Sequence, residues 1–364
     1  MPRFGSLLTG VVLTAAVAYV PAALAQYDDD LDGPPTGTVM VEMGGGVQFI
    51  ELPDMRFTFL TDSNGDVERK QTNGELSNYC GAISGSVYVP IRSRISFVAS
   101  GFYSEVDNSR RQKCESANGL DCTVQDIVDI PNQLDSWSFA GFTTKTDREV
   151  DYWGATSEVT FGTDRRLKPR RDGGFLFDYY HWGVGFNVRG LDQDNKLRLH
   201  TGDDQDQIRY DETLDTTYYG GYLSVTGEFN ILGYLGIGGN WNIRSFATFR
   251  GGVYSADTDY SGRFNLNDQL DSHLRLSDDE TTFIGGASFE TRLPLSKRMS
   301  LSLLTDYEYL SYVPRMRYVD SDDDFQGNID HTFIDDDDAL MVRTQLRLNV
   351  GLGPDAHYDE VPLK

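Results

Sequence analysis

Apolar and polar residues alternate over ten separate stretches of this sequence. In the last stretch, Leu340, Val342 and Thr344 share one face of an extended chain, and Arg343 and Gln345 share the other. A period of two with one apolar and one polar face is typical of a half-buried β-strand. We therefore predict strands at 38–49, 79–89, 95–105, 149–162, 174–189, 216–229, 243–256, 280–293, 299–312 and 338–351.

Two kinds of connection alternate between these strands. A compact soluble domain rarely contains five structureless loops of more than about 20 residues. A transmembrane β-barrel has long loops on its outer side, short turns on the other side and an even number of strands. The pattern predicts an all-β fold, a transmembrane antiparallel up-and-down β-barrel of about ten strands, or twelve if 230–242 or a long loop hides a hairpin. The long connections are predicted at 50–78, 106–148, 190–215, 257–279 and 313–337, and the short ones at 90–94, 163–173, 230–242 and 294–298.

The first residues have the pattern of a secretory signal peptide. Met1–Arg3 is basic, Leu7–Val20 is apolar, and Ala23–Ala25 is a small-x-small cleavage site. Cleavage there predicts an exported protein. The expected organisation is a signal peptide at 1–25, an acidic leader at 26–36, a barrel at 37–352 and a C-terminal extension at 353–364.

The composition narrows the function classes. The chain has 364 residues, 56 acidic and 32 basic side chains, a formal charge of −24 and a mean hydropathy of −0.42. Its 42 Asp against 14 Glu, with 37 Gly, indicate turns and strands rather than helices. A helical membrane bundle is excluded, because only one apolar run approaches the length of a spanning helix. Nucleic acid is not an expected partner, because a polyanion binds clusters of Lys and Arg.

Five stretches resemble Gram-negative outer-membrane β-barrel proteins of the smaller, porin-like type. They are TVMVEMGGGVQF, YYGGYLSVTGEF, IRSFATFRGGVYSADTDY, TTFIGGASFETRLPLSKRMSLSLLTDYEYL and ALMVRTQLRLNVGL. The resemblance covers about residues 37–352 and implies a barrel in the cell outer membrane, in contact with its lipid and with lipopolysaccharide. It departs from that class at the end of the last strand, where Leu352 and the extension replace the usual terminal aromatic residue.

Charged residues on the polar faces of the strands are expected to point into the barrel. Because a lone buried charge is costly, we predict cross-strand ion pairs that fill much of the lumen. Ten strands are closer to the eight that enclose a filled core than to the 16 to 18 that leave a wide channel. The predicted lumen network comprises Glu42, Glu158, Glu228, Glu290, Asp306, Glu308, Arg189, Arg244, Arg250, Arg292, Arg343 and Arg347.

Three functions follow from this interpretation. The leading one is a narrow channel for small ions or solutes, whose acidic external loops favour cations. The second is a structural or surface-interaction barrel that does not conduct, because Arg/Glu pairs close its lumen. The third is a hydrolase at the barrel rim, suggested by His200, His273 and His331 near aspartates. We expect no enzyme, since no G-x-S-x-G, P-loop or dinucleotide motif is present, and hence no cofactor.

Two further predictions concern the cysteines and the aromatic residues. An exported chain can form disulfides, and we favour Cys114–Cys122 with Cys80 free and partly buried. Aromatic residues are expected in two girdles, with Tyr103, Trp153, Tyr180, Trp182 and Tyr219 toward the outer rim.

A calcium site is a weaker candidate in one external loop. Asp62, Asn64 and Asp66 offer alternating oxygens, and calcium needs six to eight such ligands. However, the glycine stands in the wrong place for an EF-hand loop, and no Glu closes it. We therefore favour solvated loops, or loops bridged to lipopolysaccharide by divalent ions, and predict no dedicated metal site.

Overall fold

The computed structural model is built almost entirely of β-strands. The predicted signal peptide, the leader and nearly all of the C-terminal extension lie outside the described residues. Within the described residues, no helix is long and apolar enough to cross a membrane. The residues that the structure describes are 39–53, 58–61, 67–71, 78–92, 95–115, 121–125, 136–139, 141–162, 179–200, 206–229, 243–266, 269–296, 298–317 and 333–353.

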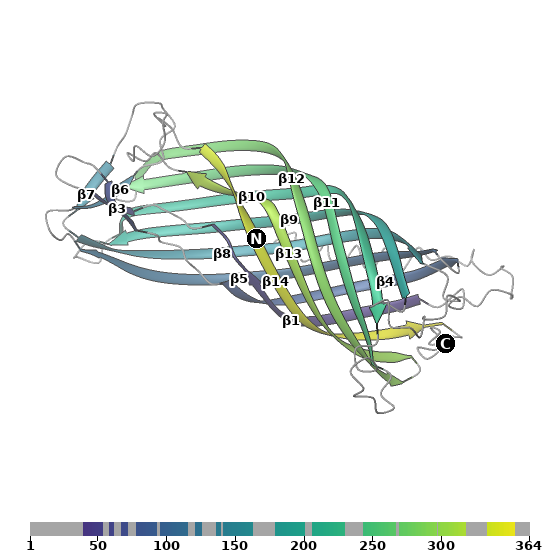
Figure 1. The fold of residues 1–364 in the computed structure, drawn as a ribbon. Helices are drawn as coiled ribbons and strands as arrows, with labels where there is room; N and C mark the ends of the chain where they lie inside the picture. The colour runs from purple at the N-terminus through teal and green to yellow at the C-terminus, as the bar shows by residue number, and fades with distance from the viewer. Residues whose placement is uncertain are drawn as a thin grey trace.

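Ten of the described strands close into an antiparallel barrel, as Figure 1 shows. Each strand pairs with its predecessor in the ring, and β1 closes the ring by pairing with both β4 and β14. The ten-strand, up-and-down prediction is confirmed. The barrel strands are β1 (Val39–Ile50), β4 (Asn78–Arg92), β5 (Ile95–Glu115), β8 (Gly141–Gly162), β9 (Tyr179–His200), β10 (Asp206–Phe229), β11 (Arg244–Leu266), β12 (Gln269–Ser296), β13 (Met299–Arg317) and β14 (Phe333–Leu352).

A second, small sheet lies at one end of the barrel (Figure 1). Its strands belong to the two longest connections, β1 to β4 and β5 to β8, and β2 joins them by pairing with β6. The sheet shows that these connections are partly folded. Its strands are β2 (Thr58–Thr61), β3 (Val67–Gln71), β6 (Asp121–Gln125) and β7 (Ser136–Phe139), in the order β3-β2-β6-β7.

The barrel strands are much longer than predicted. The connections predicted at 190–215 and 257–279 are wrong, because nearly all of these residues belong to β9, β10, β11 and β12. Only 201–205 separate β9 from β10, and only 267–268 separate β11 from β12. The wall of the barrel therefore continues well beyond the length needed to cross a bilayer, which is about 9–11 residues per strand. We call the added part of these strands, such as Leu191–His200 of β9, the extension; it is separate from the C-terminal extension at 353–364.

The extension escaped prediction because it reverses the polarity of the wall. On β9, Val184 faces outward and is 47% exposed, as expected for a lipid-facing residue. Farther along the same strand, Leu191 and Leu197 are buried inside, whereas Asp192 and Lys196 lie on the outer face. The period of two is unbroken, but the apolar side has become the inside. The extension is therefore built like a water-soluble barrel, on the same strands as a membrane barrel.

An outward-facing aromatic girdle marks the level of this reversal. Tyr103 on β5 lies opposite Trp153 on β8, and Tyr219 on β10 is 45% exposed. The placement of Tyr180 and Trp182 on the outer rim was wrong, because β9 begins at the opposite end of the barrel. There the indole of Trp182 stacks on Phe161, with ring centroids 4.8 Å apart.

Three consecutive glycines bring β1 close to β14. A Cβ added at Gly46 would lie 2.0 Å from the backbone oxygen of Thr344 and 2.7 Å from Cα of Gln345. A Cβ added at Gly45 would meet only the backbone oxygen of Ala82, at 3.7 Å. The inward-facing glycine thus permits the closing strand pair, and its outward-facing neighbour has free space.

Candidate functional site

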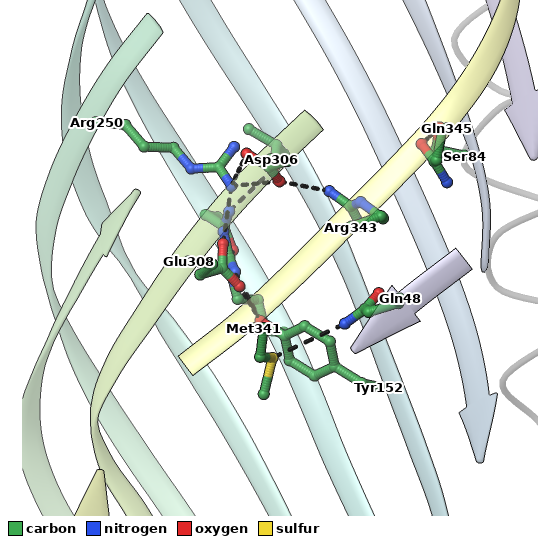
Figure 2. Close-up of polar contacts among 12 residues, drawn as sticks. Gln48, Ser84, Tyr152, Arg250, Asp306, Glu308, Met341, Arg343 and Gln345 are labelled. Atoms are coloured by element: carbon green, nitrogen blue, oxygen red, sulfur yellow. Dashed lines mark hydrogen bonds and ion pairs between the residues drawn. The ribbon is translucent and has the colours of Figure 1, made fainter. Parts of the chain in front are cut away.

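Five charged side chains from four strands meet inside the barrel, and we call them the central ion cluster. Its members are Arg189, Arg250, Asp306, Glu308 and Arg343. Asp306 accepts from Arg343 at 2.7 Å and from Arg250 at 3.0 Å, as Figure 2 shows. Glu308 accepts from Arg250 at 2.8 Å and also pairs with Arg189, which is 1% exposed. Two carboxylates therefore hold three guanidiniums across the bore.

A second group of ion pairs lies nearer the short turns. Arg292 bridges Glu290 at 2.7 Å and Glu42 at 2.8 Å, and so joins β12 to β1 across the lumen. The other oxygen of Glu42 lies 3.8 Å from Arg347 and accepts a hydrogen bond from Ser86 at 2.8 Å. The bridge connects strands that are not neighbours in the ring. It therefore narrows the bore a second time.

Three of the predicted network residues behave differently from the others. Arg244 and Glu228 form a separate pair at 3.3 Å at the turn end of β11 and β10. Glu158 has no arginine partner among the described ion pairs. It accepts hydrogen bonds from Tyr222 at 2.6 Å and from Ser224 at 2.9 Å. All twelve predicted residues point into the barrel, and all but Glu158 form ion pairs there.

Sequence reasoning missed the tyrosines that line the same space. Tyr152 receives a hydrogen bond from Arg189 at 2.7 Å and donates to Glu308. Its ring contacts Phe102, with centroids 5.1 Å apart, and the guanidinium of Arg343 lies 4.1 Å above the Phe102 ring. The signal was present, because Tyr152 shares the inward parity of Glu158, but we had assigned aromatic residues to the girdles.

Two apolar layers close the bore on the side of the central ion cluster that faces away from the short turns. The inner layer contains Ile50, Val150, Leu191, Tyr218, Ile284 and Leu310, each at most 2% exposed. Farther along the extension, the outer layer contains Phe142, Leu197, Leu199, Ile208, Tyr210, Tyr260 and Phe264. Buried polar side chains separate the layers, including Gln193, which accepts from Arg148 at 2.7 Å. The interior of the extension is thus packed like a protein core.

The outer wall of the extension has a separate charge pattern, which begins with an acidic belt. Directly above the girdle, five carboxyl residues on adjacent strands lie opposite one another in register. Tyr103 of the girdle donates to the belt, to Asp151 at 2.8 Å. Three of its residues, Asp192, Asp215 and Asp259, fall in connections that we had predicted as external loops, and they lie on strands instead. The acidic belt consists of Glu105, Asp151, Asp192, Asp215 and Asp259.

The belt makes one carboxyl group unusual. Burial, followed by the charges of Asp215 and Asp151, raises the pKa of Asp192 from 3.8 to about 6. Between these two pH values, the folded protein binds the proton more tightly than the unfolded chain does. This contribution to stability is present below about pH 4 and is lost as the pH rises toward about 6.

We therefore expect Asp192→Asn to stabilise the folded barrel at pH 7.5, by at most about 1 kcal/mol because the group is partly solvated. At pH 4 the variant and the native protein should unfold at the same urea concentration. Asp211→Asn is the control with the opposite sign, because Asp211 binds Arg209 at 3.0 Å. Equal stability of the native protein and Asp192→Asn at pH 7.5 would contradict the prediction.

The remaining candidate residues fall partly outside the described residues. Cys80 is free and buried, and Cys114 is buried at the end of β5. The side chain of Cys122 is not described, so the Cys114–Cys122 disulfide stays a prediction. Asp62, Asn64 and Asp66 also lie outside, and the described residues contain no group of His, Cys, Asp or Glu suited to a metal ion.

The histidines do not assemble a site among the described residues. His273 lies on β12, where its Nε2 is 3.5 Å from the hydroxyl of Ser261 on β11. His200 ends β9, and His331 lies outside the described residues. The rim hydrolase therefore stays an untested prediction.

The lipid-type outer face, the girdle and the closed ring together define a transmembrane β-barrel. No protein-family model and no curated protein sequence matches the chain. Among solved structures, it is similar to the outer-membrane protease OmpT from Escherichia coli, at 9% identity and a TM-score of 0.47, covering 87% of this chain and 98% of that one.

Two other similar structures are also barrels. The translocator domain of the autotransporter NalP from Neisseria meningitidis has 11% identity and a TM-score of 0.35, covering 95% of this chain and 94% of that one. The monoaromatic hydrocarbon channel CymD has 8% identity and a TM-score of 0.31, covering 88% and 90%. Similarity this remote concerns the fold, and it assigns neither activity nor substrate to this chain.

Proposed function

We propose that this protein is a barrel of the Gram-negative outer membrane that does not conduct and has no enzymatic role. In this proposal the membrane part anchors the extension, and the extension presents a rigid surface to partners outside the cell. The lipid-facing residues of β9–β14 support the location, and the predicted signal peptide supplies the route of export.

The sealed bore is the observation that carries this proposal. The central ion cluster spans it from β9, β11, β13 and β14, and Arg189, the most buried of its three arginines, is 1% exposed. The inner apolar layer covers the cluster on the side of the extension. An ion would have to cross both a buried, largely apolar layer and a network of paired charges.

The cation-favouring channel is the alternative that the sequence favoured. It requires a continuous wet path past Asp306 and Glu308. Both carboxylates are already bound to arginines at 3.0 Å or less, and each is 5% exposed. The packing therefore favours the closed barrel over the channel.

Recordings in planar bilayers test the proposal. We expect the refolded native protein to show no steady conductance at 1 M KCl. Arg250→Ala/Arg343→Ala, which removes two of the three guanidiniums across the bore, should stay closed as well, because the two apolar layers still cover it. Arg244→Ala, at the turn end, should behave in the same way. A steady cation-selective conductance of the native protein would establish the channel instead.

A further inference from the structure

The strand register places four cations side by side on the outer wall of the extension. Arg111 lies opposite Lys145, Lys145 opposite Arg198, and Arg198 opposite Arg209. These residues come from β5, β8, β9 and β10, which are consecutive in the ring. All four side chains have the outward parity of their strands and are partly or fully exposed. We call them the basic row.

The basic row, like the acidic belt, places side chains of like charge directly opposite one another. Directly opposed residues on one face of a sheet have Cβ atoms about 4.5–5.5 Å apart, and like charges at that distance are destabilising. The row below it shows the ordinary solution, since Asp147 lies opposite Lys196, and Lys196 opposite Asp211. Four cations in line thus form a costly arrangement that a line of negative charges would stabilise.

Carboxylates of the chain compensate the row only in part. Lys145 binds Asp147 at 2.7 Å, and Arg209 binds Asp211 at 3.0 Å. Both carboxylates lie two residues away on the same strand, on the membrane side of the row. On the side of the row that faces away from the membrane, Lys113 pairs with Thr143, Thr143 with His200, and His200 with Asp206, which is the one acidic residue in register there among the described residues.

The row stands too high to reach a headgroup layer of ordinary bilayer thickness. Eight residues separate Lys145 from the girdle residue Trp153 on β8, which is about 26 Å along a strand. With a strand tilt of about 40°, the row stands about 20 Å above the girdle. The headgroup layer is only about 5–8 Å thick on each side. The acidic belt also lies between the two, so an anion from the bilayer surface is a poor match.

The width of the row distinguishes between classes of polyanion. Single-stranded nucleic acid is bound by cations together with aromatic side chains on which the bases stack. The outward positions next to the row include Lys113, Thr143, Asp147, Lys196 and His200, and none of them is Phe, Tyr or Trp. A row one residue wide instead fits a thin chain with a charge on most of its units.

We propose that the basic row binds a linear acidic polysaccharide, sulfated or rich in uronic acid, at the far end of the extension. The polymer lies across β5, β8, β9 and β10, and its anionic groups alternate with Asp147 and Asp211 as partners of the row. The proposal deepens the proposed function by naming a class of partner. The polysaccharide proposal can fail while the proposed function stands, because conductance and polysaccharide binding are measured independently.

Binding of dextran sulfate to the refolded, detergent-solubilised full chain tests the row. We expect saturable binding at 150 mM salt that weakens steeply as salt increases. Arg198→Gln/Arg209→Gln should lower the affinity about 10- to 100-fold and reduce the slope of log K against log salt by about 2. The matched control is Arg263→Gln/Arg275→Gln, which removes two exposed outward cations from β11 and β12 and should bind like the native protein.

Each contrary outcome overturns the proposal. Absence of native binding at 150 mM salt would do so, as would an equal loss in both double variants, which reports only the net charge. Row-dependent binding of single-stranded DNA as tight as that of dextran sulfate would assign the row to nucleic acid. Row-dependent binding of lipopolysaccharide vesicles, without dextran sulfate binding, would assign it to the membrane surface. Heat-modified migration in gels verifies that every variant is folded.

Discussion

Replacing Asp306 by Ala is expected to lower the free energy of unfolding by about 3–5 kcal/mol. The carboxylate is 5% exposed and accepts from Arg250 at 3.0 Å and from Arg343 at 2.7 Å. Its removal leaves two guanidiniums close together inside the barrel without their shared partner. Urea titration of the refolded protein in detergent, followed by gel migration and tryptophan fluorescence, measures the change.

Glu228→Ala is the control for this prediction. Glu228 pairs with Arg244 at 3.3 Å, and the side chains of the pair are 17% and 15% exposed. Water can replace part of that interaction, so we expect a loss of about 1 kcal/mol or less. Equal losses in the two variants would mean that the central ion cluster contributes no more than a peripheral pair.

The second large effect is expected at the seam between β1 and β14. Gly46→Ala should prevent barrel closure or destabilise the folded state by about 3 kcal/mol or more. The new methyl group would overlap the backbone of Thr344 and Gln345, at 2.0 and 2.7 Å, and a backbone cannot rotate away as a side chain does. The yield of heat-modifiable, folded protein measures the effect.

Gly45→Ala tests the same seam from the other face. Its methyl group would point outward, with Ala82 at 3.7 Å as its nearest neighbour. We expect nearly native yield and stability, since both variants lose the same backbone freedom. A similar defect in the two would attribute the role of these glycines to chain flexibility rather than to close packing.

The membrane part of the fold was predictable from sequence for a clear physical reason. Lipid demands an apolar outer face, and the ionic interior demands a polar inner face, so residues such as Met43 and Glu42 alternate strongly. The extension uses the same period with Thr, Asp and Gln among its residues, and polar runs such as Asp192–Lys196 resemble loops. Its inward-facing Leu197 and Leu199 are the signal that could have extended β9.

The sequence was enough to predict which charged side chains lie inside the barrel, but not which of them form ion pairs with one another. The parity of Arg343 and Asp306 placed both inside, because each strand alternates about its own axis. Which arginine meets which carboxylate depends on register and curvature across the ring, as the bridge from Arg292 to Glu42 shows. The hydrogen bond from Tyr222 to Glu158 was not predictable for the same reason. Side chains of strands that are not neighbours meet only once the barrel closes.

The reversal of polarity along the strands also fixes how deeply the barrel sits. Sinking by a few residues would draw the acidic belt into hydrocarbon, where each carboxylate costs about 2–3 kcal/mol and five together cost on the order of 10 kcal/mol. Leu223 and Phe249 lie on the outer face of the wall, where 63% and 57% of their surface is accessible. Rising by the same amount would bring such residues from lipid into water. During insertion the acidic belt must cross the hydrocarbon layer of the membrane once. Afterwards its charges oppose movement of the barrel back through that layer.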